Sequence, residues 1–98
     1  MTLKAPRKPI DFTKVEALRK EMMLTIENMA SLFGVTRATY HSWLKGKPIR
    51  PSNDEYVRVM LKKLLVVYTE HSWPSPEVRA MDSKMRKDAL DTLLQVQA

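Results

Sequence analysis

Apolar side chains recur every three or four residues through most of this chain, which is the spacing of one face of an α-helix. The pattern predicts five helices, which begin at or just after Thr13, Thr25, Thr36, Ser52 and Ser75. The third helix ends near Gly46, the fourth near Glu70 and the fifth near Gln95. No segment alternates apolar and polar residues as a half-buried strand does. The sequence therefore predicts an all-α fold, a five-helix bundle.

Residues that can cap a helix stand at most of these starts. Thr13–Glu16 has the pattern of a capping box, although Asp11 could cap the same helix instead. Ser52–Glu55 has the same pattern at the start of the fourth helix. Ser75 can cap the fifth helix, and Pro76 suits its first position. These local signals agree with the helix starts that the apolar spacing predicts.

Residues 25–46 predict two short helices joined by a tight turn. Ala30 is small enough to let the two helices approach, and Gly34 can adopt the positive φ that a sharp turn needs. Thr36 is placed to cap the second of these helices. Its inward face is expected to hold Val35, Tyr40 and Trp43, and its outward face Arg37, Ala38, His41 and Ser42. This is the layout of a helix-turn-helix whose second helix contacts DNA.

The same stretch resembles the helix-turn-helix of the lambda-repressor/Cro-like family, also called the xenobiotic-response-element (XRE) type. The positions that match the family pattern are Thr25, Ala30, Gly34, Val35, Thr36, Thr39, Trp43 and Gly46. Met29 and Tyr40 stand where the family has similar apolar residues. Ile26 departs from the pattern, because the family commonly has a glutamine there that helps to hold a phosphate and braces the first base-contacting residue. With the first helix and the start of the fourth, the resemblance covers about half of the chain.

The resemblance implies that the exposed start of the second motif helix enters the major groove of DNA. Arg37 is then the strongest candidate for base contact, because a guanidinium can bond to O6 and N7 of guanine. Ala38 could contact a thymine methyl, and Thr25 or nearby backbone N–H groups could hold a phosphate instead of the missing glutamine. The predicted DNA-binding set also includes Thr36, Thr39, His41 and Ser42. Beyond the helix, contacts to phosphates are expected from Lys45, Lys47 and Arg50.

Several of these residues also have a plainer interpretation. Arg37 could be an ordinary solvated charge at a helix start, and His41 could be a surface residue without a role. Tyr40 and Trp43 could stack on bases, but their spacing favours a place in the core. The seven methionines are expected to fill gaps in the core rather than to bind a ligand.

The chain shows none of the residue patterns that catalysis requires. It has no cysteine, and its two histidines, His41 and His71, lie on different elements. Neither a metal-ligand spacing nor a glycine-rich phosphate loop is present in the sequence. We therefore expect no catalytic residue, no bound metal, no cofactor and no enzymatic activity. The lack of cysteine also fits a reducing compartment.

The net charge of +6 comes entirely from the first half of the chain. Residues 1–50 contain ten Lys/Arg and four Asp/Glu, whereas residues 51–98 contain seven of each. Because this charge and the helix-turn-helix share one half, double-stranded DNA is the expected partner, although basic charge can also serve solubility. The longest apolar run, residues 64–68, is far too short to span a membrane, and residues 1–12 lack the apolar segment of a secretory signal. We expect a cytoplasmic, nucleoid-associated protein without membrane contact.

Three regions are expected: a basic arm over residues 1–12, a helix-turn-helix core over 13–72 and a C-terminal helix over 73–98. The arm could lie along DNA or simply fray. The C-terminal helix is amphipathic, so it could form a homodimer interface or fold back to complete the core of one monomer. The expected interface residues are Leu65, Tyr68, Val78, Met81, Met85 and Leu93.

The function predicted from these features is sequence-specific regulation of transcription. A small phage-type or bacterial repressor would bind a palindromic operator as a homodimer and block the polymerase. The alternative is a protein-interaction module, antitoxin-like or polymerase-binding, that retains the helix-turn-helix fold. Such a module would dock its partner through the last helix and residues 66–68.

Overall fold

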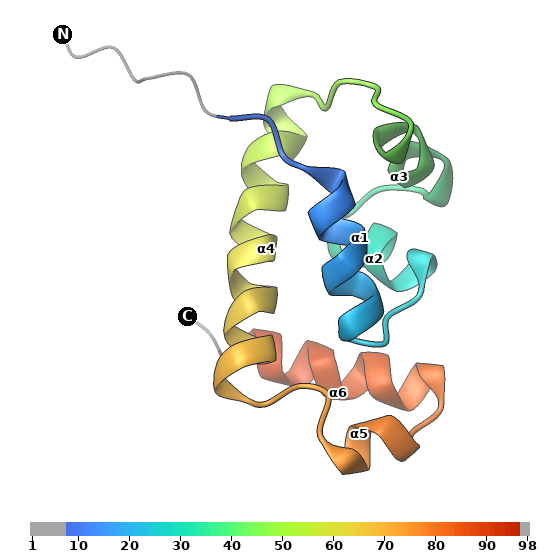
Figure 1. Cartoon of the computed structure of the whole chain (residues 1–98), viewed down its shortest axis with the longest axis vertical. Coiled ribbons are helices and arrows are strands. Elements are labelled where there is room, and N and C mark those ends of the chain that lie inside the picture. The colour runs from blue at the N-terminus through green and yellow to red at the C-terminus, as the bar shows by residue number, and fades with distance from the viewer. Residues whose placement is uncertain (1–7, 97–98) are drawn as a thin grey trace, which may run out of the picture.

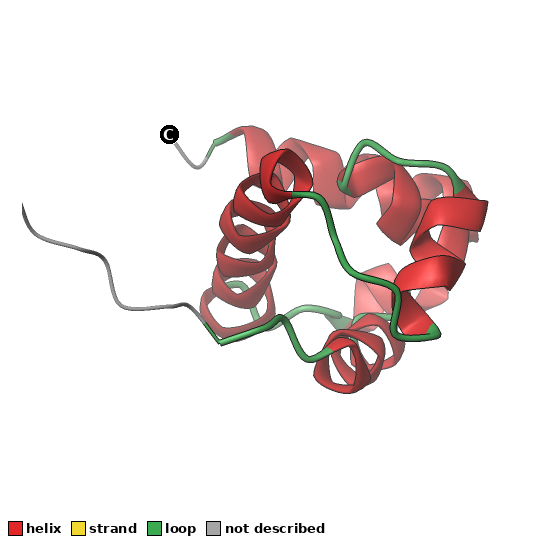
Figure 2. Ribbon diagram, turned by 90° about the horizontal axis from the view of Figure 1, so that it is seen from above, coloured by secondary structure: helices red, strands yellow, loops and turns green. Residues whose placement is uncertain are grey.

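The computed structural model describes residues 8–96, and within them the chain forms helices and no strand. Figure 1 shows the long fourth helix standing beside the first, with the second and third helices beyond the first and the fifth and sixth across the lower end. The view from above shows loops as the only connections between these helices (Figure 2). The helices are α1 (Phe12–Glu21), α2 (Ile26–Leu32), α3 (Arg37–Leu44), α4 (Pro51–Glu70), α5 (Pro76–Ala80) and α6 (Ser83–Gln95). The all-α prediction is confirmed, and the first seven residues of the expected arm lie outside the described residues.

Polar side chains cap most of these helices, as the sequence predicts. The Thr25 hydroxyl accepts a hydrogen bond from the backbone N–H of Asn28 at 3.0 Å, and the Asn28 side chain accepts one from the backbone of Thr25. Thr36 caps α3 through the backbone N–H of Thr39. Ser75 caps α5, where Pro76 takes the first helical position. Each cap satisfies a backbone donor that has no partner inside the helix.

Both predicted capping boxes are wrong, whereas Asp11, the alternative cap of the first helix, is confirmed. At the start of α1, Asp11 takes the capping position, and its carboxylate accepts a hydrogen bond from the backbone of Thr13 at 3.0 Å. The fourth helix begins one residue before Ser52, at Pro51, and its N-cap Arg50 makes no side-chain cap bond. Proline suits this first position because its φ is already helical and its missing N–H would have had no partner there.

The expected fifth helix is in fact two helices, which gives six in place of five. Met81 and Asp82 are extended between α5 and α6, with ψ of 153° and 171°. The Asp82 carboxylate accepts a hydrogen bond from the backbone of Met85 at 2.8 Å and so begins a new helix. Apolar residues continue at helical spacing across the break, so the spacing alone does not reveal it.

One core joins all six helices. Val15 of α1, Trp43 of α3, Leu64 of α4 and Leu90 of α6 are among its buried members. Four aromatic rings meet at the end of the core near α3, and neighbouring ring centres lie 5.5–6.5 Å apart in the set Phe12, Phe33, Tyr40 and Trp43. No helix within residues 8–96 is long and apolar enough to cross a membrane.

The C-terminal helices are attached to the turn between α1 and α2. The indole N–H of the buried Trp73 donates to the carbonyl of Met22 at 2.9 Å. The Arg86 guanidinium of α6 donates to the carbonyl of Met23 at 3.3 Å and to that of Met81 at 2.7 Å. These bonds, together with burial of Leu90, show that one face of α6 completes the core of the monomer.

Candidate nucleic-acid interface

The turn between α2 and α3 has the conformation that Gly34 predicts. Gly34 has φ of +70°, and a Cβ atom built there would meet nothing within 4 Å, so glycine is needed for its backbone freedom and not for space. The backbone N–H of Val35 donates to the carbonyl of Ala30 at 2.9 Å and closes the end of α2. Thr36 then caps the start of α3.

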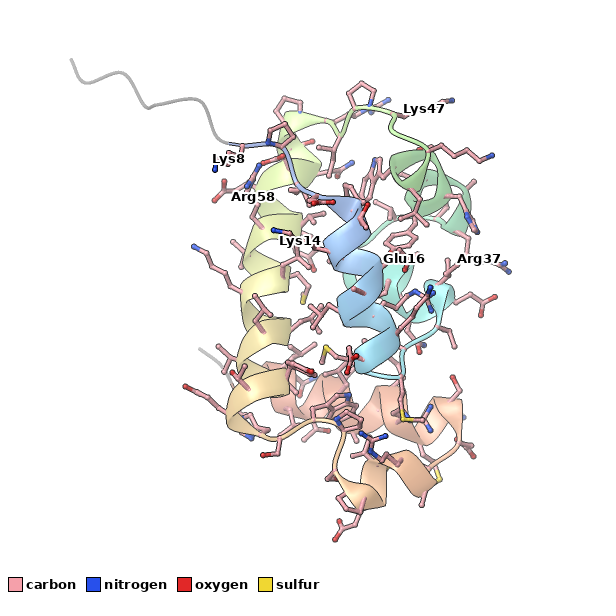
Figure 3. The ribbon with its side chains drawn as sticks, in the orientation of Figure 1. Lys8, Lys14, Glu16, Arg37, Lys47 and Arg58 are labelled. Carbon is pink, nitrogen blue, oxygen red and sulfur yellow. The ribbon has the colours of Figure 1, made fainter. Side chains whose placement is uncertain are left out.

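Helix α3 is buried on one side and open on the other. Tyr40 and Trp43 are 0% and 4% exposed, which confirms their predicted place in the core. Arg37 and Ala38, in the first turn of the helix, are exposed. Figure 3 shows the Arg37 side chain extending away from α1 and α4 into solvent. The aromatic side therefore holds α3 against the body of the protein, and the start of the helix remains accessible.

The other predicted DNA-binding residues lie at the caps of α2 and α3, along α3 and in the segment that follows it. Thr25 and Thr36 are exposed cap residues, while Thr39, His41 and Ser42 are partly buried along α3. The Ser42 hydroxyl donates to the carbonyl of Thr39 at 2.7 Å. The segment after α3 places three exposed cations beyond the end of the helix: Lys45, Lys47 and Arg50. Figure 3 shows Lys47 at the outer edge of this segment. All ten residues belong to the helix-turn-helix and the loop that follows it.

Glu27 is a neighbour of Arg37 that the sequence analysis did not single out. Its carboxylate lies 3.1 Å from Nη1 of Arg37, and the two side chains are 69% and 61% exposed. The bond uses one nitrogen of the guanidinium, so the edge formed by Nε and Nη2 is not committed to Glu27. Glu27 directly follows Ile26, the residue that stands where the family has its bracing glutamine. The acidic residue next to Ile26 was therefore the feature of the sequence that could have indicated this pair.

A polar network lies behind α3, between it and α1. The Tyr40 hydroxyl donates to a carboxylate oxygen of Glu16 at 3.2 Å, and the same oxygen is bound by Arg19. Arg19 also donates to the carbonyl of Leu24 at 2.8 Å. Burial, and after it the negative charge of Glu16, raise the pKa of Tyr40 well above its usual range. The network joins α1, the turn before α2 and the inner side of α3.

Replacing Tyr40 with phenylalanine tests this network. Loss of the hydroxyl is expected to lower the free energy of unfolding by about 1–2 kcal/mol at neutral pH. The native protein holds the tyrosine proton more tightly than the unfolded chain does. The stability that this supplies is complete below about pH 10 and is lost as the pH rises further. Urea unfolding at several alkaline pH values should therefore show that the free energy of unfolding falls more steeply with pH in the parent chain than in Tyr40→Phe. Parallel curves would contradict the assignment.

The predicted dimer residues do not share one surface. Leu65 lines a groove between α1 and α4, and the Tyr68 hydroxyl donates to Glu21 at the end of α1. Val78 is buried in the core, and the partly buried Met81 and Leu93 pack against that core. Met85 is 55% exposed on the outer side of α6.

Within residues 8–96, no group of three His, Asp or Glu side chains is arranged to hold a metal ion.

The geometry of residues 25–46 agrees with a comparison against protein families. A family model described as helix-turn-helix (HTH_3) matches residues 15–64, which is just over half of the chain. The matched region runs from α1 through most of α4 and so contains the turn at Gly34 and the exposed start of α3. No curated protein and no solved structure matches the chain. The chain belongs to the lambda-repressor-like, or XRE-type, family of DNA-binding helix-turn-helix regulators.

Proposed function

We propose that this protein regulates transcription by binding a specific DNA sequence with α3 in the major groove. The observation that supports this most is the orientation of α3, since its aromatic side is buried and Arg37 is exposed at its start. A short helix held in this way can enter a groove about 12 Å wide without rearrangement of the protein. The protein would act on DNA in the cytoplasm, at the nucleoid.

Arg37 is the proposed base-contacting residue, and Glu27 is proposed to orient it. With Nη1 bound by Glu27, the edge formed by Nε and Nη2 can face O6 and N7 of one guanine. Glu27 would thus take over the bracing role of the family's glutamine, which is absent here because Ile26 stands at that position. A carboxylate this close to DNA also repels phosphates, so it weakens binding to unrelated sequences more than binding to the correct one.

Contacts to the DNA backbone are proposed for Lys45, Lys47 and Arg50, which are exposed just beyond α3. Lys47→Ala should therefore weaken binding to all sequences by a similar factor. The slope of the logarithm of the DNA-binding constant against the logarithm of the salt concentration should decrease in magnitude by about 1. The reason is that fewer counterions are released when one phosphate contact is lost. Fluorescence anisotropy at several salt concentrations measures both quantities. Lys84→Ala, which removes an exposed cation from α6, is the control and should change neither.

We further propose that the protein is a repressor that blocks the polymerase by occupying a palindromic operator as a homodimer. One α3 helix covers a single half-site, and two-fold symmetry would place the second about one turn of DNA away. The dimer would form through the outer side of α6. Met85 and Val96 are exposed there by 55% and 70%, and eleven residues are close to three helical turns, so both lie on one side.

The dimer proposal predicts a measurable change in mass. Sedimentation equilibrium of the full chain at high micromolar concentration should show a dimer, and Met85→Glu should shift it towards monomer, because a dimer contact would bury the new carboxylates. Thr92→Glu on the same outer side should act in the same direction, whereas Glu77→Gln, on α5, should not. A parent chain that remains monomeric at that concentration would contradict this proposal.

A further inference from the structure

An open groove of about 720 Å³ lies between α1 and α4, next to the segment that precedes α1. Its apolar lining comes from α1, from α4 and from this segment: Ile10, Val15, Leu18, Val59, Leu61 and Leu65. Val59 and Leu65 are 44% and 48% exposed, whereas Val15 is buried and the other three pack against the core and are only partly buried. Exposed apolar side chains gathered in one groove are typical of a surface that binds a partner.

The rim of the groove is mainly positive. Four cations and two carboxylates line it: Lys8, Lys14, Arg58, Lys62, Asp11 and Glu55. The Arg58 guanidinium is held in place, since it bonds to Asp54 at 2.6 Å and donates to the carbonyl of Lys8 at 2.7 Å. Lys14 on α1 and Lys62 on α4 make no ion pair with the described part of the chain. An acidic partner could therefore pair with both walls of the groove.

The groove is separate from the candidate DNA-binding surface. Figure 3 shows Lys8, Lys14 and Arg58 around α4 and the near side of α1, whereas Arg37 extends from the opposite side of the molecule. None of the ten predicted DNA-binding residues lines the groove. Its apolar lining also makes a nucleic-acid backbone a poor occupant, because phosphates would be desolvated there without a partner. An occupant and DNA can thus be bound together.

We propose that this groove binds an amphipathic helix of a partner protein, with acidic residues beside its apolar stripe. An apolar stripe at helical spacing would pack against Val59, Leu65 and Leu18, as in other complexes in which a helix lies in a groove. Its acidic flanks would pair with Lys14 and Lys62. A second copy of this chain is the competing occupant, and the self-association measurements below distinguish it from a partner helix.

Two synthetic helical peptides test the proposal on the full chain. Both carry leucines at helical spacing over about four turns, one with glutamate and the other with lysine at the flanking positions. The glutamate peptide should bind saturably and shift the amide NMR signals of Leu18, Val59 and Lys62, but not those of Arg37 to Ser42. The lysine peptide should bind at least about tenfold more weakly, because like charges oppose it. Equal binding of both peptides, binding at another surface or no saturable binding would overturn the proposal.

Variants separate this site from the DNA-binding site. Val59→Glu should weaken binding of the glutamate peptide by about tenfold or more, because the new carboxylate is then buried against the apolar stripe of the peptide. Met85→Glu, an equivalent change on α6, should leave peptide binding unchanged. If Val59→Glu disturbs folding, the exposed pair Lys14→Glu and Lys62→Glu should reverse the preference between the two peptides. Failure of this reversal would contradict the role of the rim.

DNA binding and self-association provide the remaining controls. The affinity for DNA should not change in Val59→Glu. The groove proposal can therefore fail without affecting the proposed function. Loss of self-association in Val59→Glu but not in Met85→Glu would show that the groove binds a second copy, and the partner-helix proposal would then be wrong.

Discussion

Arg37→Ala is expected to reduce the preference for a selected DNA sequence over an unrelated one by about 1–3 kcal/mol, or roughly five- to 150-fold. Arg37 is exposed at the start of α3 and can donate two hydrogen bonds to one guanine, which alanine cannot do. Binding to unrelated DNA should fall much less, by the loss of one positive charge. Competition between the selected and the unrelated duplex at constant salt measures the ratio directly.

Two further variants sharpen this test. Arg79→Ala removes an exposed arginine from α5 and should leave the ratio unchanged. Glu27→Gln removes the charge that we propose orients the Arg37 guanidinium, so it should lower the ratio by a smaller factor and strengthen binding to unrelated DNA. If Arg37→Ala and Arg79→Ala give the same ratio as the parent chain, Arg37 does not contact bases.

Trp73→Ala is expected to have the largest effect on stability, a loss of about 3–5 kcal/mol in the free energy of unfolding. The indole is 3% exposed, and its N–H donates to the carbonyl of Met22. Alanine would leave a large cavity and an unpaired carbonyl at the contact between the C-terminal segment and the turn after α1. A domain of this size has only about 5–15 kcal/mol in total. Urea unfolding followed by circular dichroism measures the loss.

Neighbouring substitutions provide the controls for Trp73. His71→Ala, at an exposed position two residues earlier, should change stability by less than about 0.5 kcal/mol. Trp73→Phe retains most of the apolar volume but removes the N–H donor to Met22, so its loss should be intermediate. A loss below about 1 kcal/mol in Trp73→Ala would mean that the C-terminal segment does not support the helix-turn-helix.

The helix-turn-helix could be predicted because each of its parts depends on one residue type. Gly34 is needed for a positive φ, Thr36 for a cap, and Tyr40 and Trp43 for an aromatic face turned inward. These are local requirements, so residue type and spacing are enough to recognise them. The same is true of the exposed side of α3, which follows once the buried side is known.

Other features depend on contacts between distant residues and could not be obtained from the spacing. The break between α5 and α6 interrupts a continuous apolar pattern, and the capping carboxylate of Asp82 is the one local sign of it. The pair formed by Glu27 and Arg37 exists because the turn at Gly34 brings α2 beside α3. Val78 is one of the residues expected at a dimer interface, and it is instead the buried residue of α5 in the core of the monomer.

Selection of bound duplexes from a random DNA pool tests most directly whether α3 reads a DNA sequence. The proposed function predicts enrichment of one motif that contains a guanine, arranged as an inverted repeat with half-site centres about one helical turn apart. The same selection with Arg37→Ala should lose the preference for that guanine and retain the rest of the motif. The central claim would be contradicted if the bound pool had the same base composition as the starting pool and no shared motif, at a salt concentration where the chain still binds DNA.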